Sequence, residues 1–196
     1  MRSYSRPVRW LTLTMLALGT TLASRAQSPS LPPEWEVREQ LRTLEQGLQR
    51  LKSLLNGIRP EDWVSKGAPE AYEAQLRSLD NEIGYLGNSF QRLSEDPERL
   101  TLALEVWLRF QAVQALLESL NEGVRRYQNP ALADLVRETF AETAPTREKL
   151  RGYLVQLAAV KEAELKVMHE EAQRCRTMLL RAPQTRQDPK SNPERR

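Results

Sequence analysis

Apolar side chains recur at alternating intervals of four and three residues in three long stretches of this chain. The first series is Val37, Leu41, Leu44, Leu48, Leu51, Leu55 and Ile58. This spacing aligns its members along one face of an α-helix and is typical of helices that pack together along a seam. It predicts an all-α fold, namely an antiparallel helical bundle of four long helices plus a short fifth, with heptad (coiled-coil-like) seams.

Prolines and glycines give the boundaries of the first two helices, because proline is tolerated in a first helical turn and glycine ends helices. We predict helices over residues 33–56 and 69–93. Gly84 and Gly87 lie inside the second helix, where each costs about 1 kcal/mol relative to alanine. They indicate either a kink or the close approach of a neighbouring helix. The seam of the second helix is Tyr72, Leu76, Leu79, Ile83, Leu86, Phe90 and Leu93.

The third helix is predicted to begin with Asp96 as its N-cap and Pro97 in the first helical position, and to end at Asn129-Pro130. Further apolar residues flank its seam, so we expect it to be the most buried helix. The seam is Ala103, Val106, Phe110, Val113, Leu117, Leu120, Val124 and Tyr127, and the flanking residues are Leu100, Leu104, Trp107, Leu108 and Leu116.

A shorter helix over residues 130–142 and a last helix over 145–180 complete the prediction. The short helix directs Leu132, Leu135, Val136 and Phe140 inward, and the sequence leaves open whether it reverses the chain or only kinks it. The last helix would reach about 50 Å, against less than about 40 Å for the first two. Its apolar stripe changes phase at Lys161, so we expect the distal third to overhang the bundle.

Composition supports one helical domain over residues 27–181. Beyond residue 26 the chain has 26 Leu, 9 Val and only 2 Ile, and leucine favours helix whereas β-branched residues favour strand. A single cysteine leaves no intramolecular disulfide, so packing must stabilise the fold. Residues 182–196 are polar and contain three prolines, which predicts a disordered tail.

The first 26 residues have the three-part layout of a secretory signal peptide. Arg2, Arg6 and Arg9 precede an apolar segment over residues 10–22, and small residues precede the bond after Ala26. The apolar segment is shorter than the roughly 20 residues that span a bilayer. We therefore expect a Sec-type signal peptide with cleavage after Ala26, and a periplasmic or secreted protein that is not transmembrane after cleavage.

Removing these residues changes the charge of the chain. The whole chain carries +3, but residues 1–26 hold four of its 29 Lys and Arg and none of its 26 Asp and Glu, which leaves 25 against 26 and a net charge of −1. Nucleic-acid binding calls for a basic face on the folded part. We therefore expect no nucleic-acid partner.

Side chains for catalysis or cofactor binding are scarce. His169 is the only histidine and Cys175 the only cysteine, and their separation of six residues turns them about 240° apart on a helix. A Cys-x-x-Cys-His haem motif is absent, Met168 and Met178 lie on the same predicted helix as His169, and a di-iron site needs two histidines. We expect no cofactor, no metal and no enzymatic activity.

Four residues are candidate partner contacts: Trp63, Met168, Cys175 and Leu179. Trp63 lies in the connection after the first helix, where two interpretations stay open, a cap on one end of the bundle or a contact with a partner. Cys175 falls in the apolar stripe, where we expect burial, with an intermolecular disulfide as the alternative. The stripe near Cys175 must be covered by the short helix, by the Trp63 connection or by a second chain, which makes a homodimer one expected outcome.

Export, helical seams and the absence of catalytic motifs together favour a non-enzymatic protein of the cell envelope. We expect it to bind other, unidentified proteins in a chaperone-like, adaptor or structural role. The alternative is a periplasmic helical bundle that binds a small ligand or lipid in a cavity near Gly84 and Gly87. An apolar internal pocket would favour the alternative, and an exposed apolar patch would favour a protein partner.

Overall fold

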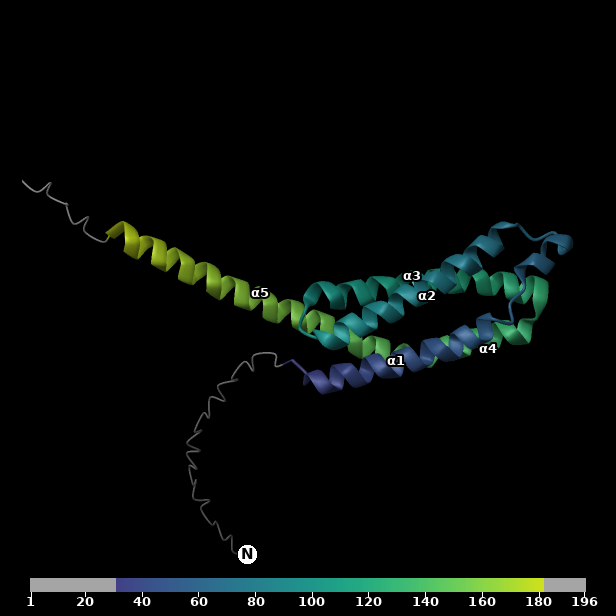
Figure 1. Ribbon diagram of the computed structural model, residues 1–196, viewed down its shortest axis with the longest axis horizontal. Coiled ribbons are helices and arrows are strands. Elements are labelled where there is room, and N and C mark those ends of the chain that lie inside the picture. The colour runs from purple at the N-terminus through teal and green to yellow at the C-terminus, as the bar shows by residue number, and fades with distance from the viewer. Residues whose placement is uncertain (1–30, 182–196) are drawn as a thin grey trace, which may run out of the picture.

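A computed structural model describes residues 31–181, and these residues form helices and no strands (Figure 1). The predicted all-α class, with four long helices and one short helix, is confirmed. The helices are α1 (Glu34–Leu55), α2 (Ala71–Glu95), α3 (Leu100–Gly123), α4 (Pro130–Ala141) and α5 (Ala144–Arg181). The predicted signal peptide, residues 1–26, and the predicted tail, residues 182–196, lie outside the described residues.

Short helical turns join the long helices at one end of the molecule. Two 3-10 turns, Pro60–Asp62 and Val64–Lys66, lie between α1 and α2, on either side of Trp63. A π-helical turn, Val124–Gln128, follows α3 and leads into α4. Asn129 caps α4, as its side-chain oxygen accepts a hydrogen bond from the backbone N–H of Ala131 at 2.9 Å.

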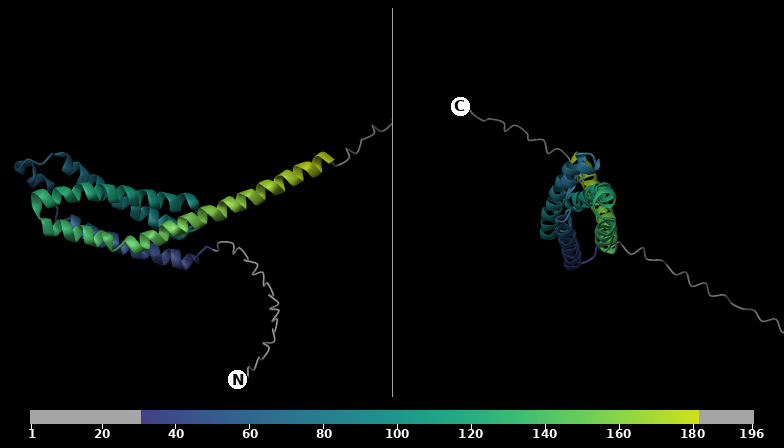
Figure 2. Two further views of the ribbon diagram at one scale, coloured as in Figure 1. Left: turned by 180° about the vertical axis from the view of Figure 1, so that it is seen from behind. Right: turned by 90° about the vertical axis from the view of Figure 1, so that its right-hand side faces the viewer.

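The helices form one elongated body from which α5 projects (Figures 1 and 2). Helix α2 packs against α3 and α1, and α1 also packs against α4 and α5. Helix α4 runs back along the body from the far end of α3, and α5 continues beyond it in the same direction (Figure 1). The short helix therefore reverses the chain, which decides the question that the sequence left open.

The predicted seams supply most of the core. Every predicted seam residue of the first helix is buried, and so are Leu79, Ile83, Leu86, Phe90 and Leu93 of α2. In α3 the buried seam residues are Ala103, Val106, Phe110, Val113, Leu117 and Leu120. Burial of a Leu-sized side chain is worth about 1.5–3 kcal/mol, so these residues dominate the stability of the body.

Two glycines permit the closest contacts between elements, and they are not the two that the sequence indicated. A Cβ on Gly47 of α1 would lie 2.6 Å from the Thr143 side chain at the α4–α5 joint, and a Cβ on Gly123 would lie 2.8 Å from the Trp63 ring. At Gly84 and Gly87 a Cβ would meet nothing within 4 Å, and α2 is continuous across both. The close approach predicted at that pair is wrong, because both glycines face an open groove.

The predicted start of the third helix is also wrong. Helix α3 begins at Leu100, and Asp96 instead follows the last residue of α2. The backbone N–H of Arg99 bonds the carbonyl of Asp96 in a tight turn at 3.3 Å, and the Tyr153 hydroxyl of α5 donates to the Pro97 carbonyl. Tertiary contacts with α5 thus fix Pro97 in the turn rather than in the helix.

Two residues predicted to flank the seam of the third helix, and one predicted to point inward from the short helix, face solvent. Leu104 and Leu108 of α3 and Leu135 of α4 are exposed, whereas Val136 and Phe140 of α4 are buried as predicted. Helix α3 covers more of its circumference with apolar residues than its neighbours α2 and α5 can bury. The remaining leucines lie on its outer side.

Charged side chains tie α2 to α3 along one edge. Glu105 accepts hydrogen bonds from Ser89 at 2.9 Å, from Arg92 at 3.2 Å and from Arg109 at 3.2 Å, and Arg109 also pairs with Glu82 at 2.9 Å. The Ser89 hydrogen bond and the two arginines hold the pKa of Glu105 below its ordinary value, although partial burial opposes them. This network of hydrogen bonds and ion pairs holds α2 against α3 along the polar edge of the two helices.

Candidate interaction surfaces

The last 20 residues of α5, residues 162–181, extend beyond the body, and no contact with the other described residues buries them (Figures 1 and 2). We call this segment the arm. Leu157 is the last buried residue of α5, and every residue from Glu162 onward is exposed. At 1.5 Å per residue the arm is about 30 Å long. The expectation that the distal part of the last helix overhangs is therefore confirmed.

The arm exposes large apolar side chains in quantity. Leu165 is 67% exposed, Met168 64% and Leu179 77%. Val167, Met178 and Leu180 are also exposed on other sides of the helix. Scattered apolar residues are ordinary on protein surfaces, but these residues form a row along a helix that packs against none of the other described residues.

Charge is divided unequally along the arm. Residues 162–171 contain four Glu and one Lys, a net charge of −3, and residues 172–181 contain three Arg and no acid, a net charge of +3. His169 is exposed on the acidic half. The arm is thus acidic next to the body and basic toward its end.

Three of the four candidate contact residues lie together on the arm, and the fourth lies at the opposite end of the molecule. Met168, Cys175 and Leu179 are all exposed. The expected burial of Cys175 is wrong, because neither the short helix nor the Trp63 connection reaches this part of α5. Both of those elements pack elsewhere in the body.

Trp63 is fully buried and caps the end of the body where α1, α2 and α3 meet. Its ring lies 5.4 Å from the Tyr72 ring and 6.3 Å from the Tyr127 ring, centroid to centroid. Its indole N–H donates to the side-chain oxygen of Gln128 at 3.2 Å. Gln128 also donates to the Gly57 carbonyl at 2.7 Å, so the cluster is closed by hydrogen bonds. Of the two interpretations of Trp63, the structure matches the cap.

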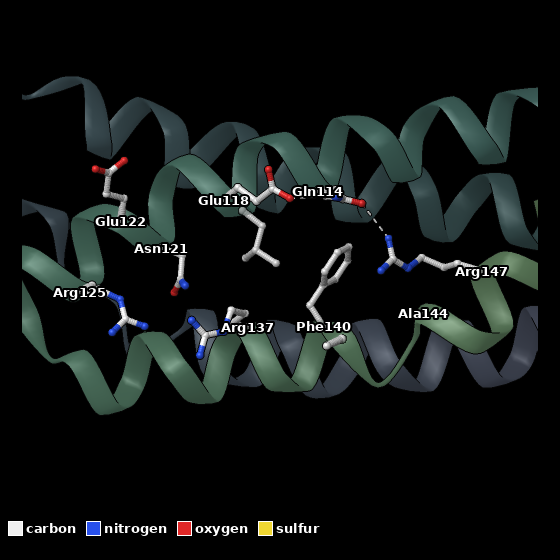
Figure 3. A pocket seen from close by; sticks show the side chains of 11 residues that line it. Gln114, Glu118, Asn121, Glu122, Arg125, Arg137, Phe140, Ala144 and Arg147 are labelled. Atoms are coloured by element: carbon white, nitrogen blue, oxygen red, sulfur yellow. Dashed lines mark hydrogen bonds between the residues drawn. The ribbon is translucent and has the colours of Figure 1, made fainter.

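A groove of about 440 Å³ lies between α3, α4 and the start of α5 (Figure 3). The guanidinium of Arg147 stacks over the Phe140 ring at 4.3 Å and donates to the Gln114 side chain at 2.9 Å. The Nε of Arg147 and the Oδ1 of Asn121 are buried without a hydrogen-bond partner. Desolvation lowers the pKa of Arg147 from its ordinary value, although the nearby carboxylate of Glu118 opposes this shift. The groove therefore combines the apolar side chains of Leu117 and Phe140 with two carboxylates and three guanidinium groups, which belong to Glu118, Glu122, Arg125, Arg137 and Arg147.

A second groove, of about 430 Å³, lies between α1 and α2 beside Gly84 and Gly87. This is where the sequence suggested a cavity, but its walls are largely polar and charged. Arg42, Glu45 and Lys52 of α1 line it. It is not the apolar cavity that a lipid requires.

Sequence reasoning missed the groove at Arg147, because its walls come from three helices whose order in space the sequence does not give. It also missed the division of charge along the arm. The unequal distribution of charge is visible in the sequence, but helices commonly carry solvated charges. It points to a binding role only when the structure shows that the same helix exposes a row of apolar residues.

Comparison of the chain with models of known families, with curated proteins and with solved structures gives no significant match. Within residues 31–181, no group of three or more His, Cys, Asp and Glu side chains is placed to hold a metal ion. One helical stretch of the described part, Leu100–Gln128, is long and apolar enough to cross a membrane by length and composition alone. The same stretch supplies much of the core of the body.

Proposed function

We propose that this chain is an exported, non-enzymatic helical protein that binds other proteins in the cell envelope, as a chaperone-like factor, adaptor or structural element. The observation that carries the proposal is the arm, which exposes Leu165, Met168 and Leu179 on one helix. Each of these side chains would gain about 1.5–3 kcal/mol if another surface packed against it. A protein partner would supply that surface.

The rest of the molecule supports the same role. We infer that the helices of the body form an antiparallel bundle with heptad-type seams, anchored by buried residues such as Leu44 and Phe110. The core of such a body contains no residue of the arm. The arm is then free to bind without cost to the fold, as an adaptor requires.

Site-specific crosslinking in the native envelope tests the proposal. A photoreactive amino acid at Leu179 of the arm should form covalent adducts with other envelope proteins. The matched control is the same amino acid at Leu135, which is also an exposed leucine but lies on the body. Adducts from neither position, or equally from both, would refute the proposal that the arm is the binding element.

A second candidate function is binding of a small amphipathic anion in the groove of Figure 3. The buried, unpartnered Nε of Arg147 beside Phe140 favours it over the polar groove at Gly84. A medium-chain fatty acid is the probe, with calorimetric titration of the protein and of an Arg147→Met variant. Binding that the variant abolishes would support this function, and equal heats for both proteins would exclude it.

A further inference from the structure

We propose that the arm pairs with the arm of a second copy of this chain in antiparallel orientation, so that the acidic half of each arm lies against the basic half of the other. This inference rests on the proposed role of the arm as a protein-binding element and names its partner. Three properties of the described residues carry it: the free apolar row, the division of charge and the position of the body.

The apolar row has the spacing of a two-helix seam. Leu165, Met168, Ala172, Cys175 and Leu179 follow one another at intervals of three, four, three and four residues, and all five are exposed. This is the repeat with which two helices bury their apolar sides against each other. The three ways to cover the row were the short helix, the Trp63 connection and a second chain. Within residues 31–181 the first two pack in the body, which leaves a second chain among the three.

The apolar row does not determine whether two arms pair in parallel or antiparallel orientation, because its intervals are nearly the same from either end. The charges of the arm do determine the orientation. In a parallel pair, the −3 halves would lie side by side and so would the +3 halves, whereas an antiparallel pair sets −3 against +3 twice. Like charges along a shared interface repel, and opposite charges attract and fix the orientation.

The position of the body agrees with this orientation. The body joins the arm at its acidic end and the arm points away from it (Figures 1 and 2). An antiparallel pair therefore places the two bodies at opposite ends of a paired segment about 30 Å long. A parallel pair would bring both bodies to the same end, where they compete for space.

The surface that two paired arms would bury is small, and this size determines how tightly the dimer is expected to associate. Each arm offers a strip about 30 Å long and about 10 Å wide, less than a standard protein interface. We therefore expect reversible dimerisation that depends on concentration. Because opposite charges contribute to it, added salt should weaken the antiparallel dimer, whereas salt would strengthen a parallel one by screening repulsion.

Analytical ultracentrifugation of the chain from residue 27, at rising concentration, should show the mass double. Leu179→Glu should abolish the dimer, and the control Leu135→Glu on the body should leave it unchanged. Reversing the basic half (Arg174→Glu, Arg176→Glu, Arg181→Glu) should weaken dimerisation at least about tenfold, because acidic halves then face each other. Reversing the acidic half (Glu164→Arg, Glu170→Arg, Glu171→Arg) should do the same. A mixture of the two reversed proteins should regain association, which a merely misfolded arm could not.

Distances between spin labels report whether the two arms pair in parallel or antiparallel orientation. With Cys175→Ser as background, labels at Leu180→Cys near the two ends should lie about 25 Å apart along the axis in an antiparallel pair, and about 10 Å apart in a parallel one. The short distance would overturn the proposal. So would a monomer at every concentration, or a dimer that survives Leu179→Glu.

The outcomes also separate this proposal from the proposed function. A chain that stays monomeric, yet crosslinks from Leu179 to other envelope proteins, overturns the antiparallel pair and leaves the function standing. Adsorption to vesicles of anionic phospholipid without any change of mass in solution would assign the arm to a lipid surface and refute both.

Discussion

At the scale of single residues, the packing of this protein depends on which glycines lie against neighbouring side chains. Gly123 lies under two aromatic rings, and a Cβ there would lie 2.7 Å from Tyr72 and 2.8 Å from Trp63. Both rings belong to the closed cluster that caps the body, so neither can move without breaking contacts with the other. Gly84 has no such neighbour and occupies the middle of a helix.

The two glycines should therefore respond oppositely to the same substitution. Gly123→Ala should destabilise the fold by about 1–3 kcal/mol through overpacking. Gly84→Ala should stabilise it by about 0.5–1 kcal/mol, because alanine is the better helix former and meets nothing. Urea unfolding followed by circular dichroism measures both changes. A change of the same sign in both variants would contradict the assignment of Gly123 as a packing position.

Tyr153 carries the largest shift in pKa among the described residues. Burial, followed by the nearby carboxylates of Glu98 and Glu34, raises the pKa of its hydroxyl from 10 to about 12. The folded protein thus holds this proton more tightly than the unfolded chain does. The stabilisation is complete below pH 10 and is lost as the pH rises from there toward 12.

We expect the free energy of unfolding to fall by on the order of 1 kcal/mol over that range of pH. Tyr153→Phe should lose about 1 kcal/mol at neutral pH, because the Pro97 carbonyl then lacks its donor. The variant should also lose most of the decline at alkaline pH. Denaturant unfolding at neutral and alkaline pH measures both effects, and an unchanged alkaline decline in the variant would rule Tyr153 out as its source.

At the scale of elements, α5 is one continuous helix with two different environments. Its first half places Leu150, Tyr153 and Leu157 in the core, whereas its second half buries nothing. Between them, Lys161 pairs with Glu98 at 3.6 Å and with Glu164 at 3.2 Å, at the point where the helix leaves the body. The stability of the body should thus depend on the first half alone.

Removing residues 162–196 should leave the free energy of unfolding of the monomer within about 0.5 kcal/mol of its original value, as for surface changes in general. Ending the chain after Lys149 should prevent folding, because the three core residues of α5 are then missing. Thermal unfolding at low protein concentration, where the monomer dominates, distinguishes these outcomes. A large loss of stability from the shorter deletion would show that the arm packs on the body in solution.

At the scale of the whole molecule, compartment and architecture act together. Residues 1–26 predict export, and the rest of the chain holds a single cysteine, Cys175, exposed on the arm. No disulfide can therefore stabilise the folded monomer, and its stability has to come from the helical core.

Mass spectrometry of the protein from its native host tests the export prediction. The expected N-terminus is Gln27, because small residues precede the bond after Ala26. Recovery of the chain with an intact Met1 from the soluble cytoplasm would contradict the prediction.

The sequence by itself determined the helices and their inner faces. The repeat through Leu41, Leu44 and Leu48 places side chains on one side of a helix whatever lies beyond it, because the helical period is local. Proline and asparagine likewise began α4 where predicted, since Pro130 is tolerated in a first helical turn and Asn129 caps the helix. Helix α3 itself ended earlier, at Gly123, and a π-helical turn leads from it to Asn129. The overhang of α5 was predicted from its length relative to the first two helices and from the change of phase of its apolar stripe at Lys161, both of which can be read along the chain.

The tertiary structure decided everything that depends on which surfaces meet. The same apolar spacing describes Leu157 in the core and Leu179 in solvent, because periodicity gives the face of a helix but not whether a partner exists there. For that reason Cys175 was expected to be buried and is exposed, and Gly123 rather than Gly84 proved to be the close contact. A side chain is buried where two helices pack against each other, and which helices pack together is decided only by the tertiary fold.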